Sequence, residues 1–170
     1  MAKSRRFALL LTAVGLATSS VVIGAATSAS SAPEQQAGPA AAGQLIASNM
    51  NNRCLSVVNF NKENGAATHM YDCNGDASQR WALQHTLLRS DLNTTKCLDV
   101  SFGNGDNGAM IGMFDCHGGT AQQWYWHQAE LRNNINHKCL TIADSNTWNG
   151  AALVLRTCEG DDNQRWRPIG

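Results

Sequence analysis

Short apolar runs separated by turn signals occupy the chain from about residue 43 onward. Leu98-Asp99-Val100 alternates apolar and polar positions, as a strand with one buried face does, and residues 109–114 and 152–155 are apolar runs of strand length. Asn-Gly pairs stand between such segments and favour tight turns, because both residues tolerate positive φ. No window keeps a 3.6-residue apolar period, so the pattern predicts an all-β domain with few helices.

The pattern repeats three times with a period of 42 or 43 residues. Each unit has a Cys-Leu pair, an Asn-Gly-Ala ten residues after that cysteine, a second cysteine nine residues later and a Gln-x-Trp six residues further on. The Cys-Leu pairs begin at Cys54, Cys97 and Cys139, and the Asn-Gly-Ala motifs at Asn64, Asn107 and Asn149. The second cysteines are Cys73, Cys116 and Cys158, and the Gln-x-Trp motifs begin at Gln79, Gln122 and Gln164. Such a period has room for about four strands of roughly ten residues each, turns included. The repeat therefore predicts a twelve-stranded, pseudo-threefold domain, closed so that no sheet edge is exposed.

Residues 1–30 are typical of an export signal. A basic stretch with Lys3, Arg5 and Arg6 precedes an apolar run and a group of small residues, and we expect cleavage near Ala29. A retained membrane anchor is the alternative, but hydroxyl residues interrupt the apolar run. A twin-arginine route is a second possibility for export. We expect a secreted, extracellular protein with no membrane span after cleavage.

Residues 31–42 hold two of the three prolines and no large apolar residue, and they are typical of a linker. The folded domain then spans residues 43–170. The chain has 13 basic and 13 acidic residues, of which three basic and one acidic precede residue 43. The predicted domain therefore carries ten basic against twelve acidic residues. It lacks the basic excess of a nucleic-acid-binding protein, so we expect no nucleic-acid partner.

Six cysteines in an exported chain of this size indicate disulfides. Threefold equivalence leaves two kinds of pairing: within each unit, or cyclically between units. We expect pairing within units, because the enclosed loops are then equal in length. A structural zinc site is the alternative, but the chain has no Cys-x-x-Cys pair, and we expect no metal or cofactor. The expected pairs are Cys54 with Cys73, Cys97 with Cys116, and Cys139 with Cys158.

Three units with Cys-Leu-x-Val or Cys-Leu-x-Ile, Asn-Gly, a second cysteine and Gln-x-Trp resemble the ricin B-type lectin family. Its members are β-trefoil carbohydrate-binding modules. The resemblance covers residues 43–170 and implies a β-trefoil whose partners are glycans or polysaccharides. We expect the Gln-x-Trp tryptophans in the core and the glutamines satisfying nearby backbone groups.

The resemblance also implies the parts of a sugar site. An aspartate after the first cysteine accepts hydrogen bonds from sugar hydroxyls, and an aromatic ring two residues before the second cysteine stacks on the sugar. In the middle unit these are Asp99 and Phe114, with His117 and Gln122 as further polar groups. Asn107 is a candidate donor, although we expect its main role in the turn. Ala121 departs from the family, which usually has asparagine there.

The other two units match less well. The first keeps Tyr71 and Gln79 but has Ser56 in place of the aspartate, with His69 and Asn74 as possible polar contacts. The third has Thr141 for the aspartate and Arg156 for the aromatic residue, with Asp144 and Trp148 as candidates for a different pocket.

We therefore expect a secreted lectin that recognises galactose- or xylose-type sugars mainly through its middle unit. The alternative is a secreted protein-binding trefoil, either a protease inhibitor or a subunit of a larger enzyme or toxin complex. We do not expect an enzyme, because the repeats fill the predicted domain and no His-Glu-x-x-His or Gly-x-Ser-x-Gly motif occurs.

Overall fold

The computed structural model describes residues 42–170, so the predicted export signal and most of the predicted linker lie outside the described residues. The described part has twelve strands: β1 (Gln44–Ser48), β2 (Cys54–Val57), β3 (Ala66–Tyr71), β4 (Arg80–Gln84), β5 (Leu87–Ser90), β6 (Asn93–Val100), β7 (Ala109–Asp115), β8 (Trp124–His127), β9 (Glu130–Asn133), β10 (Cys139–Ile142), β11 (Leu153–Arg156) and β12 (Trp166–Ile169). Its helices are short 3₁₀ turns: η1 (Val58–Phe60), η2 (Ala77–Gln79), η3 (Ser101–Gly103), η4 (Thr120–Gln122), η5 (Ala143–Ser145) and η6 (Asp162–Gln164). The predicted all-β, twelve-stranded fold is confirmed.

Six of the strands form a closed barrel. Its hairpins are β4–β5, β8–β9 and the pair made by β12 and β1, which joins the last strand to the first. The strands β1 and β4 pair directly, and bridges at Leu87–Gln123 and Glu130–Arg165 join the remaining hairpins. The ring of pairings leaves this layer without a long open edge.

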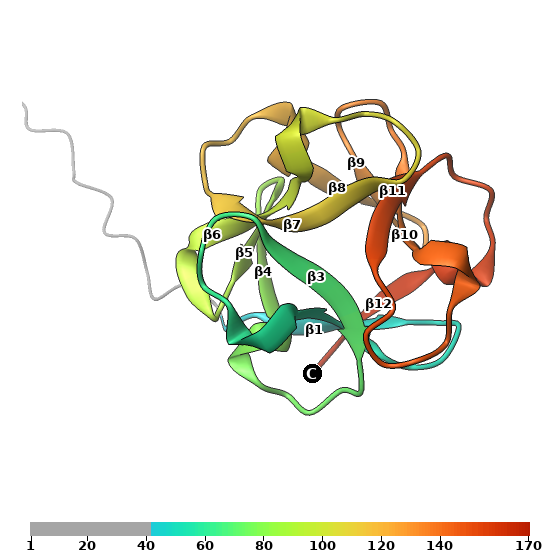
Figure 1. Ribbon diagram of the computed structural model, residues 1–170, viewed down its shortest axis with the longest axis horizontal. Helices are drawn as coiled ribbons and strands as arrows, with labels where there is room; N and C mark the ends of the chain where they lie inside the picture. The colour runs from blue at the N-terminus through green and yellow to red at the C-terminus, as the bar shows by residue number, and fades with distance from the viewer. Residues whose placement is uncertain (1–41) are drawn as a thin grey trace, which may run out of the picture. The chain divides into compact units, whose positions relative to one another are not determined.

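The other six strands form three hairpins, β2–β3, β6–β7 and β10–β11. Figure 1 shows three similar lobes around a centre on which β3, β7 and β11 converge. Pairings of β7 with β3 and with β11, and a bridge between His69 and Ala152, connect the hairpins. A six-stranded barrel with three hairpins is the β-trefoil, as the resemblance implies.

The three Gln-x-Trp tryptophans form the centre of the core. Trp81, Trp124 and Trp166 are at most 2% exposed, which confirms the prediction. Each indole nitrogen donates a hydrogen bond to the carbonyl oxygen of the leucine after the first cysteine of its own unit, at 3.2, 2.9 and 3.0 Å. Each tryptophan therefore connects a barrel strand to the hairpin of its own unit by a hydrogen bond, and it also buries a large apolar area.

Each unit is closed by its own disulfide, as the equal loop lengths predict. The bonds join Cys54 to Cys73, Cys97 to Cys116 and Cys139 to Cys158. The Cα atoms lie 5.1, 5.1 and 5.2 Å apart, in the normal range for a disulfide. Each bond constrains a loop of similar size in the unfolded chain and contributes about 3 kcal/mol on a loop-entropy model.

The asparagine of each Asn-Gly pair connects neighbouring units. Asn64 in the first unit accepts a hydrogen bond from the amide of Asp115 in the middle unit, at 2.8 Å. Asn107 in the middle unit accepts one from the amide of Thr157 in the third, at 2.9 Å. Asn149 in the third unit accepts one from the amide of Asp72 in the first, also at 2.9 Å. The three contacts run in one direction around the pseudo-threefold axis, so the asparagines hold the units together.

We expect Asn64→Ala to lower the free energy of unfolding by about 1–2 kcal/mol, because it removes several hydrogen bonds at once. Asn64 also donates to Asp115 Oδ2 at 2.7 Å and accepts from Lys96 Nζ at 2.6 Å. Urea unfolding followed by circular dichroism measures the change. Asn61→Ala is the matched control, since Asn61 accepts only a local bond from the amide of Glu63. Equal effects of the two substitutions would contradict the inter-unit role of Asn64.

Candidate functional site

The middle unit places its candidate residues on one face of the β6–β7 hairpin. Asp99 pairs with Gly112, and Cys97 pairs with Phe114. Residues directly opposite each other, and residues two apart on one strand, point to the same face. Asp99 and Phe114 therefore share a face, although they lie 15 positions apart in the chain.

Asp99 is a carboxylate at the bottom of this face, with a side chain only 10% exposed. Burial raises the pKa of the Asp99 carboxyl, while a hydrogen bond with Gln122 and the nearby His117 ring oppose that shift. His117 Nε2 lies 3.7 Å from Asp99 Oδ2. A buried carboxylate with few partners of its own keeps lone pairs available for hydroxyl donors, and such charge-assisted bonds are strong.

His117 and Phe114 stand above Asp99 as exposed side chains. Their rings meet edge to face, with centroids 6.2 Å apart and an angle of 72° between planes. His117 Nδ1 accepts a hydrogen bond from the amide of Gly119 at 3.0 Å, so the neutral ring carries its proton on Nε2, toward Asp99. Phe114 is 42% exposed and offers an apolar surface. A buried acceptor thus lies beside an exposed donor and an exposed aromatic ring.

Gln122 is a fully buried support for this arrangement. Its Oε1 accepts hydrogen bonds from the amides of His117 and Gly118, at 2.9 and 3.2 Å, and its Nε2 donates to the Asp115 carbonyl at 2.9 Å. Gln79 and Gln164 make the equivalent bonds in their own units. The prediction that these glutamines satisfy backbone groups is confirmed. Gln122 holds the loop that carries His117.

Asn107 is not brought to this cluster. Its side chain binds Thr157 of the third unit, as described above. Ala121, which replaces the usual asparagine, offers only its carbonyl oxygen, and Asn133 Nδ2 donates to that oxygen at 3.0 Å. The middle-unit cluster therefore consists of Asp99, Phe114, His117 and the supporting Gln122.

The first unit has a hollow of about 350 Å³ at the equivalent place. Tyr71 and His69 stack along one side, with ring centroids 5.4 Å apart, and burial lowers the pKa of His69. Ser56 replaces the carboxylate. Asp76 lines the same hollow and accepts a hydrogen bond from Asn74 at 2.7 Å. Asp76 was not predicted as a site residue, because this residue lies in the loop before Gln79 and outside the repeated motifs.

The third unit lacks a carboxylate at this position. Thr141 is buried, donates to the Cys139 carbonyl at 3.0 Å and lies 3.1 Å from Gln164 Nε2, so its hydroxyl is used within the fold. Arg156 is exposed where the other units have an aromatic ring. Trp148 is 77% exposed in the loop before the Asn-Gly turn.

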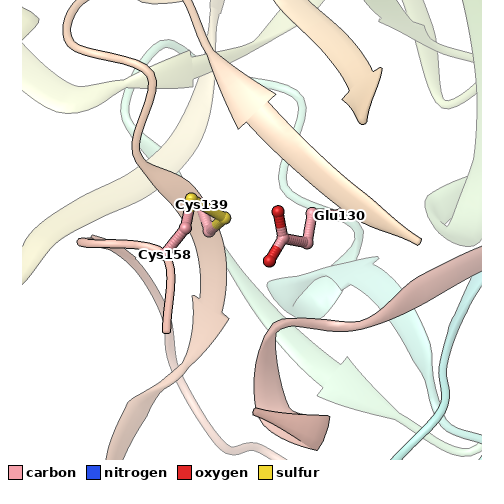
Figure 2. Close-up of side chains that lie close together, drawn as sticks. All are labelled: Glu130, Cys139 and Cys158. Carbon is pink, nitrogen blue, oxygen red and sulfur yellow. A yellow bond between two sulfur atoms is a disulfide. The ribbon is translucent and has the colours of Figure 1, made fainter. Parts of the chain in front are cut away.

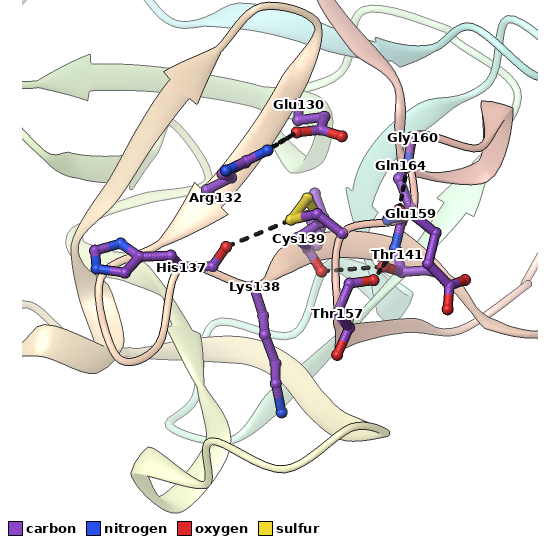
Figure 3. Close-up of a disulfide and its surroundings, with 12 residues drawn as sticks. Glu130, Arg132, His137, Lys138, Cys139, Thr141, Thr157, Glu159, Gly160 and Gln164 are labelled. Atoms are coloured by element: carbon purple, nitrogen blue, oxygen red, sulfur yellow. Dashed lines mark hydrogen bonds and ion pairs between the residues drawn. A yellow bond between two sulfur atoms is a disulfide. The ribbon is translucent and has the colours of Figure 1, made fainter.

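One group of possible metal-ligand side chains in the described residues involves the third disulfide, as Figure 2 shows: Glu130, Cys139 and Cys158. The two sulfur atoms are bonded to each other and are not thiolates. Glu130 accepts a hydrogen bond from Arg132 at 2.6 Å, and Figure 3 shows this ion pair beside the disulfide. The group therefore lacks the thiolates that a zinc site needs.

No helix within residues 42–170 is long and apolar enough to cross a membrane.

A family model for the ricin-type beta-trefoil lectin domain matches residues 41–166. No curated protein matches the chain significantly. The designed three-fold symmetric protein ThreeFoil is 25% identical, with a TM-score of 0.69 over 75% of this chain and 97% of its own.

Two natural lectin structures are also similar. The C-half of an earthworm R-type lectin, in complex with GalNAc, is 20% identical, with a TM-score of 0.63 over 74% of this chain and 95% of its own. The β-trefoil lectin of the Vibrio vulnificus hemolysin/cytolysin, with N-acetyl-D-lactosamine bound, is 24% identical, with a TM-score of 0.61 over 75% of this chain and 94% of its own. At these identities the two structures support the fold alone.

Proposed function

Because the chain belongs to the ricin-type β-trefoil lectin domain family, we propose that it is a secreted lectin that binds galactose- or xylose-type sugars mainly through its middle unit. We propose that the protein binds the sugar and does not convert it chemically. The observation that carries it is the buried Asp99 carboxylate beside the exposed Phe114 and His117.

The geometry suits a pyranose ring. Such a ring has apolar C–H groups on one face and hydroxyl groups around its edge. Phe114 offers a flat apolar surface for the C–H face, and Asp99 accepts hydrogen bonds from two neighbouring hydroxyls. His117 Nε2 donates to a hydroxyl oxygen from above the carboxylate. GalNAc and N-acetyl-D-lactosamine, the sugars in the earthworm and Vibrio structures, are suitable first probes for such a site.

The hollow of the first unit is a second, weaker candidate. It has an aromatic wall at Tyr71 and a carboxylate at Asp76, but this carboxylate is exposed and already accepts a bond from Asn74. Competition with water and with Asn74 lowers the gain from a sugar hydroxyl there. Two sites on one chain would raise the affinity for multivalent glycan surfaces.

A glycan array tests the proposal. The purified protein is applied to immobilised galactosides, xylo-oligosaccharides and unrelated glycans, with Phe114→Ala as a second sample. We expect signal on the galactose- or xylose-type glycans and its loss in the variant. No signal on any glycan, together with a stoichiometric protein partner recovered from culture medium, would favour a protein-binding trefoil instead.

Sugar binding should also weaken in acid. Burial raises the pKa of Asp99, so its carboxylate protonates at a pH above the ordinary value of about 3.9 and then accepts fewer hydrogen bonds. Protonation at Asp99 occurs in the folded protein first, so this group itself favours folding as the pH falls. We therefore expect affinity to fall while the protein is still folded. Titration calorimetry across this pH range, with circular dichroism at each point, measures both. Constant affinity down to the onset of unfolding would contradict a role for ionised Asp99.

A further inference from the structure

The hollow of the first unit differs from the Asp99 cluster in where it carries negative charge. Ser56, which is buried and neutral, lines this hollow at the position that Asp99 holds in the middle unit. The carboxylate of the hollow is instead Asp76, the residue before η2, where the middle unit has Gly119 before η4. The first unit therefore lacks a buried acceptor for sugar hydroxyls and has an exposed acidic group.

Asp76 has no cationic partner within residues 42–170, because the ion pairs of this part of the chain join other residues. Asn74 donates one hydrogen bond to Asp76 Oδ2 at 2.7 Å, and this neutral amide leaves the negative charge uncompensated. Arg80 is the nearest cation along the chain, but its Nε and Nη1 donate to the carbonyl oxygens of Gly75 and Gly43. An ammonium group bound in the hollow would therefore be attracted by a carboxylate that no other cation neutralises.

Aromatic side chains line the same hollow. Phe60 and Tyr71 are 55% and 44% exposed, and the ring of His69 stacks on that of Tyr71. The middle unit has glycine at the positions of Phe60 and His69, namely Gly103 and Gly112. Burial lowers the pKa of His69, so its ring is neutral at about pH 7 and adds no positive charge to the hollow. The first unit thus combines aromatic faces with a carboxylate, and both attract cationic groups.

The hollow also has the size and the polar groups that one sugar ring needs. Its volume of about 350 Å³ lies within the range of roughly 300–1,000 Å³ that is usual for small-molecule sites. Asn59 and Asn74 line it as exposed residues with side-chain amides, which suit the hydroxyl groups of a ring. A ring that carries both hydroxyls and a positive charge therefore matches the lining better than a neutral ring does.

We propose that the first unit binds a saccharide with a free, protonated amine, such as a deacetylated hexosamine, whereas the middle unit binds neutral rings. The ring lies against Tyr71, and its ammonium group lies between Phe60 and the Asp76 carboxylate. Such an amine is largely protonated at about pH 7, as an α-amino group is, and N-acetylation removes its charge. The inference rests on the proposed function, because it takes the first unit to bind a sugar ring as the middle unit does.

Titration calorimetry at about pH 7 tests the amine site in an Asp99→Ala background, which removes the buried acceptor of the middle unit. The probes are D-galactosamine and N-acetyl-D-galactosamine, which share one ring and differ in charge. We expect galactosamine to bind about five- to ten-fold more tightly, equivalent to about 1.0–1.4 kcal/mol. The ratio should fall with added salt, because salt screens exposed charges. Asp76→Asn in this background should bring the ratio to about two or less, since it removes the charge and keeps the size of the side chain.

Asp161→Asn is the matched control, added to the same background. Asp161 precedes η6 in the third unit as Asp76 precedes η2 in the first, and it is equally exposed. Arg165 follows it at the spacing at which Arg80 follows Asp76. The Asp161→Asn variant changes the net charge by the same amount, and it should keep the ratio of the Asp99→Ala background.

Phe60→Ser tests the aromatic contribution separately. Serine occupies the equivalent position in the third unit, where Ser145 has a φ of +49° against +52° for Phe60, so the substitution suits the backbone. We expect it to weaken galactosamine binding in the Asp99→Ala background by about two- to five-fold, since it removes one of the aromatic faces beside the ammonium group. Unchanged galactosamine affinity would contradict the place given to Phe60.

The outcomes separate this inference from the lectin function. A ratio near one, a ratio that Asp76→Asn leaves unchanged, or no binding of either probe in the Asp99→Ala background overturns the amine site, while sugar binding by the unsubstituted protein leaves the lectin function intact. No binding of any saccharide by the unsubstituted protein overturns both. Ethanolamine, an amine without a ring, should bind at least about ten-fold more weakly than galactosamine. Equal binding of the two amines would show attraction of a cation alone and would overturn the saccharide site.

Discussion

Asp99→Ala is expected to weaken sugar binding by about ten- to hundred-fold, because hydrogen bonds to a charged group contribute about 1.5–3 kcal/mol. The loss is large for a single side chain because Asp99 is the acceptor that the hairpin buries beside Phe114 and His117. Titration calorimetry with the best sugar from the array measures the change. Stability should change little, because the substitution also removes a buried charge that burial penalises.

Asp106→Ala provides the matched control for Asp99→Ala. Asp106 is an exposed carboxylate of the same unit, in the turn between η3 and β7 and apart from the Asp99 cluster. The Asp106→Ala variant should bind sugar with the affinity of the wild type, since neither the charge nor the side chain of Asp106 contributes to the pocket. If Asp99→Ala retains affinity within about two-fold of the wild type, the middle-unit assignment is wrong.

Trp124→Ala should lower the free energy of unfolding by about 3–5 kcal/mol, the usual cost of replacing a buried tryptophan with alanine. Trp124 is fully buried in β8, and its indole nitrogen donates to the Leu98 carbonyl at 2.9 Å. The substitution therefore leaves a large cavity in the core and removes a contact between the barrel and the β6–β7 hairpin. Guanidinium unfolding followed by circular dichroism, with the disulfides intact, measures the change.

Trp148→Ala separates burial from the mere loss of a tryptophan. Trp148 is 77% exposed, so its substitution should change stability by at most about 0.5 kcal/mol. Comparable losses from Trp124→Ala and Trp148→Ala would contradict the account of the core.

The repeat spacing carried most of the fold prediction. Equal spacing of the cysteines indicated equivalent units and left two kinds of pairing, and equal loop lengths favoured the pairing within units that the structure has. The Gln-x-Trp prediction succeeded for a similar reason, because a large apolar side chain in every unit of a small domain must be buried. Apolar runs at 109–114 and 152–155 lie on β7 and β11 with boundaries shifted by about one residue, the usual uncertainty of strand ends.

Long-range contacts were harder to infer. The Asn-Gly pairs were interpreted as local turns, and Gly65, Gly108 and Gly150 do have positive φ. The asparagine side chains, however, bind the next unit around the axis, and nothing in the local sequence specifies such a partner. The recurrence of an aspartate or threonine before each second cysteine, at Asp72, Asp115 and Thr157, was the available signal.

The candidate site was predicted in part. The resemblance to the ricin B-type lectin family implied Asp99, Phe114, His117 and Gln122 as site residues, and the structure places them close together. Asp76 at the first-unit hollow was not predicted, because it lies in the loop before Gln79 and only the folded backbone brings it beside Tyr71.

An amide chemical-shift titration of the ¹⁵N-labelled protein with the best sugar from the array tests the middle-unit site most directly. We expect the largest shift changes on the middle unit, at the amides of Asp99, Phe114 and His117 and of the Gly118–Gly119 loop. Largest changes on the third unit or on the barrel strands, with the middle unit unaffected, would contradict a sugar site in the middle unit.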